Sequence, residues 1–239
     1  MTVFVSVISH EHESIIEKLA CLPQLNVHPA IKVVLKNNVK SSHEKLIKYC
    51  SGNGIILLDN CESRGFGYNN NVVFDYCRSS LGMVDGDLFV ILNPDLYISV
   101  EDLLLLHDLM LSTNVNLASV NLYKNFEKNA YDYNVRRYPT LLSFIRSFLN
   151  FPDDMKIDKS LINQPVSVDW AAGSFLAFSA GLYRRLSGFD ARYFMYCEDI
   201  DICWRANRAY NTKLIYYPNI EAVHFARFNN RTLFSKHFV

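Results

Sequence analysis

Short apolar runs alternate with helix-like stretches through the first 115 residues, and this alternation constrains the fold more than any other feature of the sequence. Between the runs, apolar residues recur at helical spacing, as Ile15, Ile16 and Leu19 do. Regular strand–helix alternation predicts an α/β fold in which helices cover both faces of a parallel sheet. The expected strands are 3–8, 31–35, 54–58 and 88–92, and the expected helices are 13–21, 44–50, 69–78 and 100–111, the last capped by Ser99.

The second half of the chain lacks this regular alternation. It contains a polar and aromatic stretch that we expect to be irregular, followed by an apolar, helix-like stretch. The change near residue 115 predicts two fused halves, 1–115 and 116–239, of a single domain. The expected strands are 117–123, 166–178 and 213–217, the expected helices are 181–186 and 199–207, the irregular stretch is 124–138, and the apolar stretch is 141–151.

Composition excludes some classes of protein. The chain has 239 residues, of which 50% are hydrophobic and 13% aromatic, so it can bury a substantial core. Its 24 Lys and Arg balance its 24 Asp and Glu, which argues against a nucleic-acid binder. The six cysteines form no Cys-x-x-Cys pair. Neither a basic N-terminal region nor a run of 18 apolar residues occurs, so we expect no leader sequence and no transmembrane helix. We therefore expect reduced thiols and a cytoplasmic location.

Three carboxylates lie within four positions near the C-terminal end of the chain. Glu198, Asp199 and Asp201 have apolar neighbours and are followed by Arg205. Carboxylates in apolar surroundings are costly unless they are paired or bound, so the cluster indicates general-base chemistry or cation binding. Asp201 and Arg205 would pair across one helical turn, which leaves Glu198 and Asp199 at the mouth of the helix, facing a pocket. The alternative is a helix N-terminus whose acids only favour the helix dipole.

A second acidic position follows the strand expected over 88–92. The strand leads into Asn93-Pro94-Asp95, where Asp95 is a candidate ligand for a divalent cation. Such a cation would neutralise a diphosphate leaving group. Asn-Pro-Asp is also a turn sequence, which is the structural alternative. The two acidic sites together favour the chemical interpretation.

A glycine-rich turn precedes the helix expected over 69–78. It runs from Arg64 through Gly65, Phe66 and Gly67 to Asn71. Glycines let a backbone approach a ligand closely, and the amides at a helix N-terminus favour anions. The segment lacks the Gly-x-Gly-x-x-Gly dinucleotide fingerprint, and an ordinary strand-to-helix turn is the alternative.

One histidine has a distinctive context. His224 ends an apolar segment, and its imidazole could bind a metal or donate to a phosphate, although a packed histidine is the alternative. His10 and His12 flank Glu11 after the first expected strand, and their role is left open.

Two segments are candidates for contact with a membrane. Leu141–Leu149 is apolar enough to touch a lipid surface, although a core or dimer helix is an equal alternative. The tail Phe225–Val239 carries Arg227, Arg231 and Lys236 among phenylalanines and contains no acid. Basic residues draw a segment towards anionic lipid, so weak peripheral attachment is expected.

Five segments, distributed over nearly the whole chain, resemble those of a known family. They are 5–10, 65–70, 92–95, 170–174 and 188–205. The last is the most specific. Together they resemble the bacterial family-2 glycosyltransferases of the GT-A fold, and most of all the rhamnosyltransferases of O-antigen and cell-wall polysaccharide assembly. The resemblance implies a Rossmann-like, mostly parallel sheet, with a nucleotide-sugar-binding half over 1–115 and an acceptor-binding, catalytic half over 116–239.

The resemblance also implies roles for single residues. Asp199 would be the general base, with Glu198 shaping its pocket or touching the acceptor. Asn93 departs from the family pattern by replacing the first acid of the metal motif, so we expect modest metal affinity. The implied donor-binding residues are Ser9, Asn37, Arg64, Gly65, Phe66, Asn70, Asn93 and Asp95; the acceptor-binding residues are Trp170, Gly173 and Glu198; and the ligands of a Mg²⁺ or Mn²⁺ ion are Asp95 and His224.

The implied function is an inverting, metal-dependent transfer of a sugar. The donor would be dTDP-rhamnose and the acceptor a lipid-linked saccharide of lipopolysaccharide (O-antigen) biosynthesis, at the cytoplasmic face of the inner membrane. A transferase that uses a UDP-hexose is the alternative within the same class. A nucleotide-sugar-binding protein without catalysis is the alternative from another class.

Overall fold

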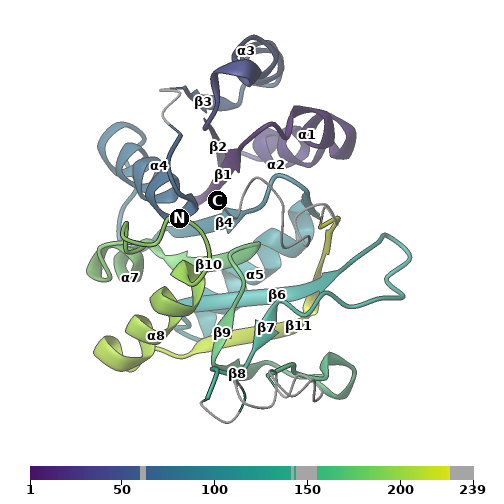
Figure 1. Ribbon diagram of the computed structural model, residues 1–239, viewed down its shortest axis with the longest axis vertical. Coiled ribbons are helices and arrows are strands. Elements are labelled where there is room, and N and C mark those ends of the chain that lie inside the picture. Colours follow the sequence, from purple (N-terminus) through teal and green to yellow (C-terminus); the bar gives the residue numbers. More distant parts are fainter. Residues whose placement is uncertain (60–62, 141–142, 144–154, 227–239) are drawn as a thin grey trace.

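The computed structural model of the protein describes residues 1–59, 63–140, 143 and 155–226 (Figure 1). Its strands are β1 (Val3–Ser9), β2 (Ile31–Asn37), β3 (Ile56–Leu58), β4 (Leu88–Leu92), β5 (Leu96–Ile98), β6 (Leu117–Tyr123), β7 (Val135–Arg136), β8 (Val166–Val168), β9 (Trp170–Ala171), β10 (Phe175–Ser179) and β11 (Leu214–His224). Its α-helices are α1 (Glu13–Leu19), α2 (Cys21–Val27), α3 (His43–Gly52), α4 (Phe66–Ser80), α5 (Val100–Ser112), α7 (Ala180–Arg185) and α8 (Glu198–Tyr210), and two short 3₁₀ helices cover Lys40–Ser42 and Lys159–Leu161.

A nine-stranded sheet runs through both halves of the chain in the order β3-β2-β1-β4-β10-β6-β11-β5, with β8 also paired to β11. The strands of the first half, β1 to β4, pair in parallel as the sequence predicts. In the second half, β10 is antiparallel to both β4 and β6, and β11 is antiparallel to β5 and β8. β11 is also parallel to β6, so the second half adds both parallel and antiparallel pairs to the mostly parallel sheet that the sequence predicts. A buried apolar strand has the same composition in either direction, so its sequence does not encode its orientation.

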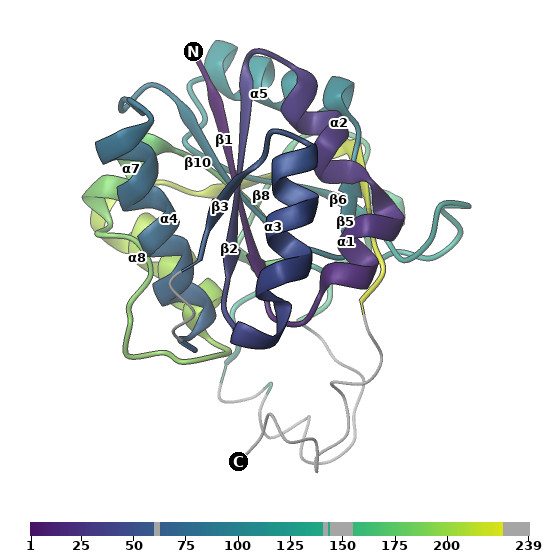
Figure 2. The ribbon, with the colours of Figure 1, turned by 90° about the horizontal axis from the view of Figure 1, so that it is seen from above.

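Helices cover both faces of the sheet, and the side chains of β1 divide between two apolar clusters. Val3, Val5 and Val7 pack with residues of α1, α2, α3 and α5, whereas Phe4 and Ile8 pack with residues of α4, α7 and α8. Figure 2 shows these two groups of helices on opposite sides of the strands. Because successive side chains of a strand point to opposite faces, a strand buried on both faces reads as a continuous apolar run.

Several elements differ from the sequence prediction. The helix expected over 13–21 stops at Leu19, because Ala20 is left-handed with φ 48°, and α2 then begins. The expected last strand, 213–217, continues to His224. Pro218 reads as the end of a strand, but a register shift between Tyr217 and Glu221 accommodates it. The strand β5 was not predicted, and the irregular stretch 124–138 contains the short strand β7.

The candidate membrane segments 141–149 and 225–239 lie almost entirely outside the described residues, which include only Ser143, Phe225 and Ala226 from them. Within the part of the chain that is described, no helix has the length and apolar character needed to cross a bilayer.

The cap of α5 offers a test of the fold. Ser99 accepts a hydrogen bond from the Asp102 amide at 3.0 Å, as predicted. We expect Ser99→Ala to lower the free energy of unfolding by about 1 kcal/mol, because an amide of the first turn loses its acceptor. Ser112→Ala, at the exposed end of the same helix, is the control and should stay within about 0.5 kcal/mol of the parent. Equal effects in urea unfolding would contradict the capping role.

Candidate active site

Polar side chains gather where β1, β2 and β3 end at the same edge of the sheet. Ser9 lies opposite Asn37 in the register of β1 and β2, and both are buried. The Asn37 amide donates to Asp59 Oδ1 at 3.0 Å, and His43 also contacts Asp59. Asp59 follows β3, so three neighbouring strands contribute polar groups to this edge.

Asp95 lies just beyond β4 and takes part in a buried chain of three ionisable groups. His224 Nε2 lies 3.3 Å from Asp95 Oδ1, and His224 Nδ1 lies 2.6 Å from Asp132 Oδ2. Burial alone would lower the pKa of His224, but the hydrogen bonds and charges of the two carboxylates outweigh it and raise that pKa to about 9. Burial would raise the pKa values of Asp95 and Asp132, but pairing with His224 outweighs burial and lowers both pKa values. Both carboxylates are therefore ionised at neutral pH.

Backbone pairing holds this chain of groups in place. His224 pairs with Leu96 in the β5–β11 ladder, and the Phe225 amide donates to Asp95 O at 3.0 Å. The Asp132 amide donates to Leu122 O at 2.9 Å. That carbonyl also lies 3.4 Å from Nζ of Lys159, whose pKa burial lowers to about 7. A polar network that includes the Leu122 carbonyl and the buried Lys159 side chain therefore supports Asp132.

The residues around Asp95 fit a divalent cation that arrives with a substrate. Asp95 and His224 offer two ligands, and the contact between His224 and Asp132 orients the imidazole as a carboxylate orients metal-binding histidines. Binding would require the metal to displace the Nε2 proton. No group of three His, Cys, Asp or Glu side chains among the described residues could hold a metal alone. Phosphate oxygens and water would complete the shell, as they commonly do for Mg²⁺.

The acid cluster begins at the first turn of α8. Asp201 and Arg205 pair at 2.7 Å, as the sequence predicts, and Arg205 also donates to Leu186 O and Gly188 O. Glu198 is only 6% exposed, and its Oε2 finds no hydrogen-bond partner within the described chain. Burial raises the pKa of Glu198 to about 7.

Asp199 is held by two backbone amides. Its Oδ2 accepts from the Gly173 amide at 3.2 Å, and its Oδ1 accepts from the Ile200 amide at 2.8 Å. Burial raises the pKa of Asp199, while these two hydrogen bonds lower it. The carboxylate is thus fixed in orientation and retains lone pairs that can accept a proton.

The two acidic sites lie at one edge of the sheet because β4 and β10 are antiparallel. Leu92, the last residue of β4, pairs with Phe175, the first residue of β10. Just beyond this pair, the Asn93 amide donates to Ser174 O at 3.0 Å. The segment that leads to Asp95 therefore runs beside the turn that holds Asp199.

The glycine-rich turn has a packing role that sequence reasoning did not identify. A Cβ at Gly65 would overlap the Phe194 carbonyl, and a Cβ at Gly67 would lie 2.7 Å from Phe189 Cβ. The first amide of α4, that of Phe66, donates to Phe194 O at 3.1 Å. The turn is therefore packed against the loop that precedes α8.

The other predicted residues occupy varied positions. Asn70 accepts from Ser6 Oγ at 2.7 Å and donates to Phe66 O at 3.0 Å. The Arg64 amide donates to Asn38 Oδ1 at 3.0 Å. Trp170 is mostly buried, and its indole donates to Arg137 O at 2.9 Å. Sequence reasoning missed Asp132, Lys159 and Asp59, which stand in no motif and reach the site only through long-range pairing.

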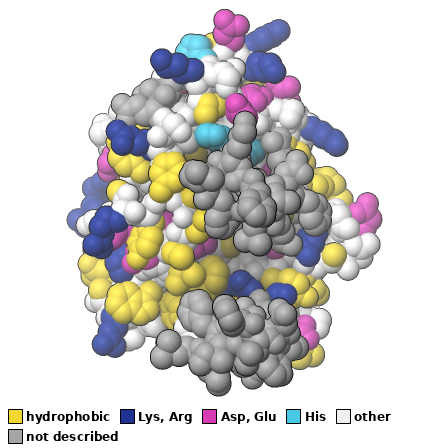
Figure 3. Space-filling model, in the orientation of Figure 1, with side chains coloured by type: hydrophobic (Ala, Val, Ile, Leu, Met, Phe, Trp, Pro, Cys, Tyr) yellow, Lys and Arg dark blue, Asp and Glu magenta, His cyan; other side chains and the backbone are white. Residues whose placement is uncertain are grey.

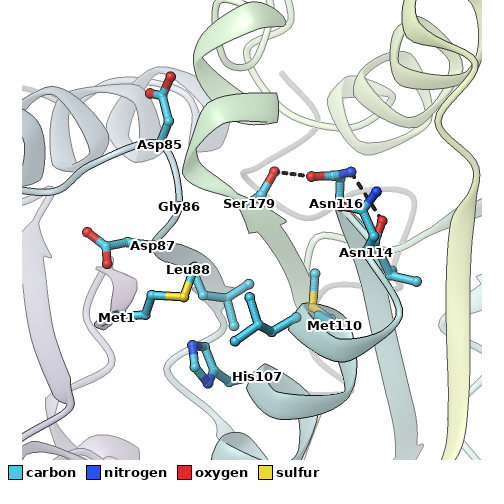
Figure 4. Close-up of a pocket in the computed structure, with 12 residues that line it drawn as sticks. Met1, Asp85, Gly86, Asp87, Leu88, His107, Met110, Asn114, Asn116 and Ser179 are labelled. Carbon is cyan, nitrogen blue, oxygen red and sulfur yellow. Dashed lines mark hydrogen bonds between the residues drawn. The ribbon is translucent and has the colours of Figure 1, made fainter.

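Two cavities of the described chain lie apart from these acids. One, of about 160 Å³, borders Met1, Asp87, Asn116 and Ser179 (Figure 4). Asp87 precedes β4 and Asp95 follows it, so this cavity lies at the edge of the sheet opposite Asp95. The other, of about 350 Å³, lies between α4 and α7.

Apolar side chains also gather on the face shown in Figure 3, over the region where Figure 1 places α8.

Comparison with known proteins gives the chain its context. It is 36% identical over 244 residues to the rhamnosyltransferase WbbL of Escherichia coli K12, a match that covers 99% of this chain and 88% of that protein. A shorter match, 39% identical over 57 residues, covers 24% of this chain and 18% of an N-acetylglucosaminyl-diphospho-decaprenol L-rhamnosyltransferase of Mycobacterium tuberculosis H37Rv. No family model matches the sequence.

The fold is also that of a solved glycosyltransferase. The structure of GalNAc-T7 with UDP, GalNAc and Mn²⁺ superimposes with a TM-score of 0.66 at 14% identity. The match covers 94% of this chain, which spans 44% of the GalNAc-T7 chain. With this GT-A fold and with 36% identity over almost its whole length to a rhamnosyltransferase, the chain belongs to the family-2 glycosyltransferases.

Proposed function

We propose that the protein is an inverting, metal-dependent rhamnosyltransferase of glycan biosynthesis. One observation carries the proposal: the β4–β10 ladder sets the Asp95–His224–Asp132 chain beside the turn that holds Asp199. We call Asp95 and His224 the first, cation-binding pole of the site and Asp199 the second, proton-accepting pole. Two such poles at one edge of the sheet suit the transfer of a sugar from a nucleoside diphosphate. The rhamnosyltransferase relative, matched over nearly the whole chain, supports this reading.

At the first pole, Asp95 and His224 would hold Mg²⁺ or Mn²⁺. Such a cation, when bound, neutralises the charge that develops on a diphosphate leaving group. Asp132 fixes the imidazole through Nδ1, so the histidine presents Nε2 to the site. The Mn²⁺ and UDP named in the GalNAc-T7 structure support a divalent cation in this fold.

At the second pole, Asp199 would act as general base. An acceptor hydroxyl attacks the anomeric carbon while its proton passes to the carboxylate, and the bond from that carbon to the diphosphate oxygen breaks. A single displacement of this kind inverts the anomeric carbon. Glu198 would shape the acceptor side, because its unpartnered Oε2 needs a hydrogen-bond partner there.

The donor we propose is dTDP-rhamnose, and the acceptor a saccharide on a lipid diphosphate. The diphospho-decaprenol named in the M. tuberculosis relative supports this class of acceptor. Ser9, Asn37, Arg64, Gly65, Phe66, Asn70 and Asn93 would line the donor side, and Trp170 and Gly173 the acceptor side. We place the reaction in O-antigen assembly at the cytoplasmic face of the membrane, with peripheral attachment.

The metal pole is tested by calorimetric titration of dTDP with Mn²⁺ present and absent. We expect Asp95→Ala to abolish the metal-dependent part of binding, because it removes the only carboxylate ligand we assign. Asp132→Asn should weaken that part by about 10- to 100-fold, because it removes the negative charge of the side chain that orients His224.

The control is Asp108→Asn, which alters an exposed carboxylate paired with His107 in a comparable way. It should bind like the parent. Metal-dependent binding that survives Asp95→Ala would contradict the assignment.

The base is tested by turnover of dTDP-rhamnose, with UDP-glucose in parallel. We expect Asp199→Asn to lower kcat by about 10²–10⁴-fold with donor binding preserved, because asparagine cannot accept the proton. Glu198→Gln should cost less, and Asp201→Asn should act mainly on stability through Arg205.

A larger loss of turnover in folded Glu198→Gln than in Asp199→Asn would show that the base is Glu198. Faster turnover of UDP-glucose by the parent would exclude rhamnose as the preferred sugar. Binding of both nucleotides without turnover would favour a non-catalytic binding protein.

A further inference from the structure

Phe66 touches both segments that hold the first turn of α8. Its backbone amide donates to Phe194 O, in the loop that leads into Glu198. Its ring lies against Gly173, where a Cβ would come within 2.8 Å of Phe66 Cε1. Gly173 is the residue whose amide donates to Asp199. A single residue of the glycine-rich turn therefore contacts both supports of the acid cluster.

The loop before α8 needs such supports because its backbone is strained. Tyr196 and Cys197 are consecutive non-glycine residues with φ of 69° and 67°. Left-handed backbone is unfavourable for a non-glycine residue, and it persists only where the surrounding structure holds it. Asn71 holds the start of the loop through Phe189, and the Phe66 amide holds its middle at Phe194.

Phe66 is itself anchored to the centre of the sheet. Asn70 accepts from Ser6 of β1 and donates to the carbonyl of Phe66. The ring also packs on Phe189, with centroids 6.0 Å apart. Its backbone is therefore anchored within residues 1–115, whereas its ring packs against residues 116–239, which contain the groups that it supports.

We propose that Phe66 is a positioning residue for the general base, acting through Gly173 and Phe194 to hold Asp199 in its reactive orientation. The proposal rests on the role of Asp199 proposed above. It assigns to the glycine-rich turn a function besides donor binding: the turn that faces the donor also sets the geometry of the group that deprotonates the acceptor.

Hydrogen exchange of the full chain tests the coupling without any substrate. We expect Phe66→Leu to speed hydrogen exchange of the Gly173 amide by at least about tenfold. The substitution removes the ring that packs against Gly173, so the hydrogen bond from this amide to Asp199 opens more often. Phe74→Leu is the matched control, since it makes the same change on the same helix and in the same apolar cluster. It should lower stability but leave exchange at Gly173 unchanged. Unchanged exchange in Phe66→Leu, or an equal rise in Phe74→Leu, would overturn the proposal.

Kinetics with dTDP-rhamnose separate positioning from donor binding. We expect Phe66→Leu to lower kcat by about 10- to 100-fold with the donor KM within about twofold, because small misplacement of a reacting group is costly. A raised KM with unchanged kcat would show that Phe66 only binds the donor.

A double-mutant cycle gives the final check. Gly173→Ala alone should lower kcat, because its methyl group meets the Phe66 ring. Combined with Phe66→Leu it should cost less than the product of the two single effects, because the smaller side chain makes room. Independent effects would contradict direct contact. If the parent turns over no nucleotide sugar, the proposed function fails, while the exchange result still decides the coupling.

Discussion

The antiparallel pairing of β4 with β10 is the constraint on which the rest of the site depends. β4 carries the chain to Asp95, and β10 leaves the turn that contains Gly173. Because Leu92 pairs with Phe175, those two ends coincide. This pairing brings Asp95 and Asp199 to the same edge of the sheet. β10 also pairs with β6, so the same strand joins the two halves of the sheet.

The buried ionisable groups of the two poles differ in whether they have partners of opposite charge. Around His224, two carboxylates compensate the buried imidazolium and raise its pKa to about 9. At the start of α8, Glu198 Oε2 has no hydrogen-bond partner within the described chain and Asp199 accepts only from backbone amides, and burial raises the pKa of both carboxyl groups. The first pole is therefore arranged to stabilise charge, and the second to hold carboxylates that readily take up a proton.

Much of the framework could be predicted from the sequence, because it depends on local patterns. The strands β1, β2, β4 and β6 are apolar runs, and Ser99 with Asp102 is a local capping pattern that the structure confirms. Asp95, Asp199 and His224 stood out because of their neighbours in the sequence. The orientation of β10, the partnership of Asp132 with His224, and the contacts of Gly65 and Gly67 with the loop before α8 could not be predicted. Each depends on residues far apart in the sequence, such as Asp132 and His224, which are 92 positions apart. Pairing over such distances leaves no local signal.

The central claim is that one carboxylate, Asp199, drives a single displacement at the anomeric carbon. The most direct measurement is the anomeric configuration of the glycoside that the parent protein forms from a donor of defined configuration, read by NMR from the one-bond carbon–hydrogen coupling. The account predicts a product with the configuration opposite to that of the donor. A product that retains the donor's configuration would require two displacements or a covalent intermediate, and would contradict the account.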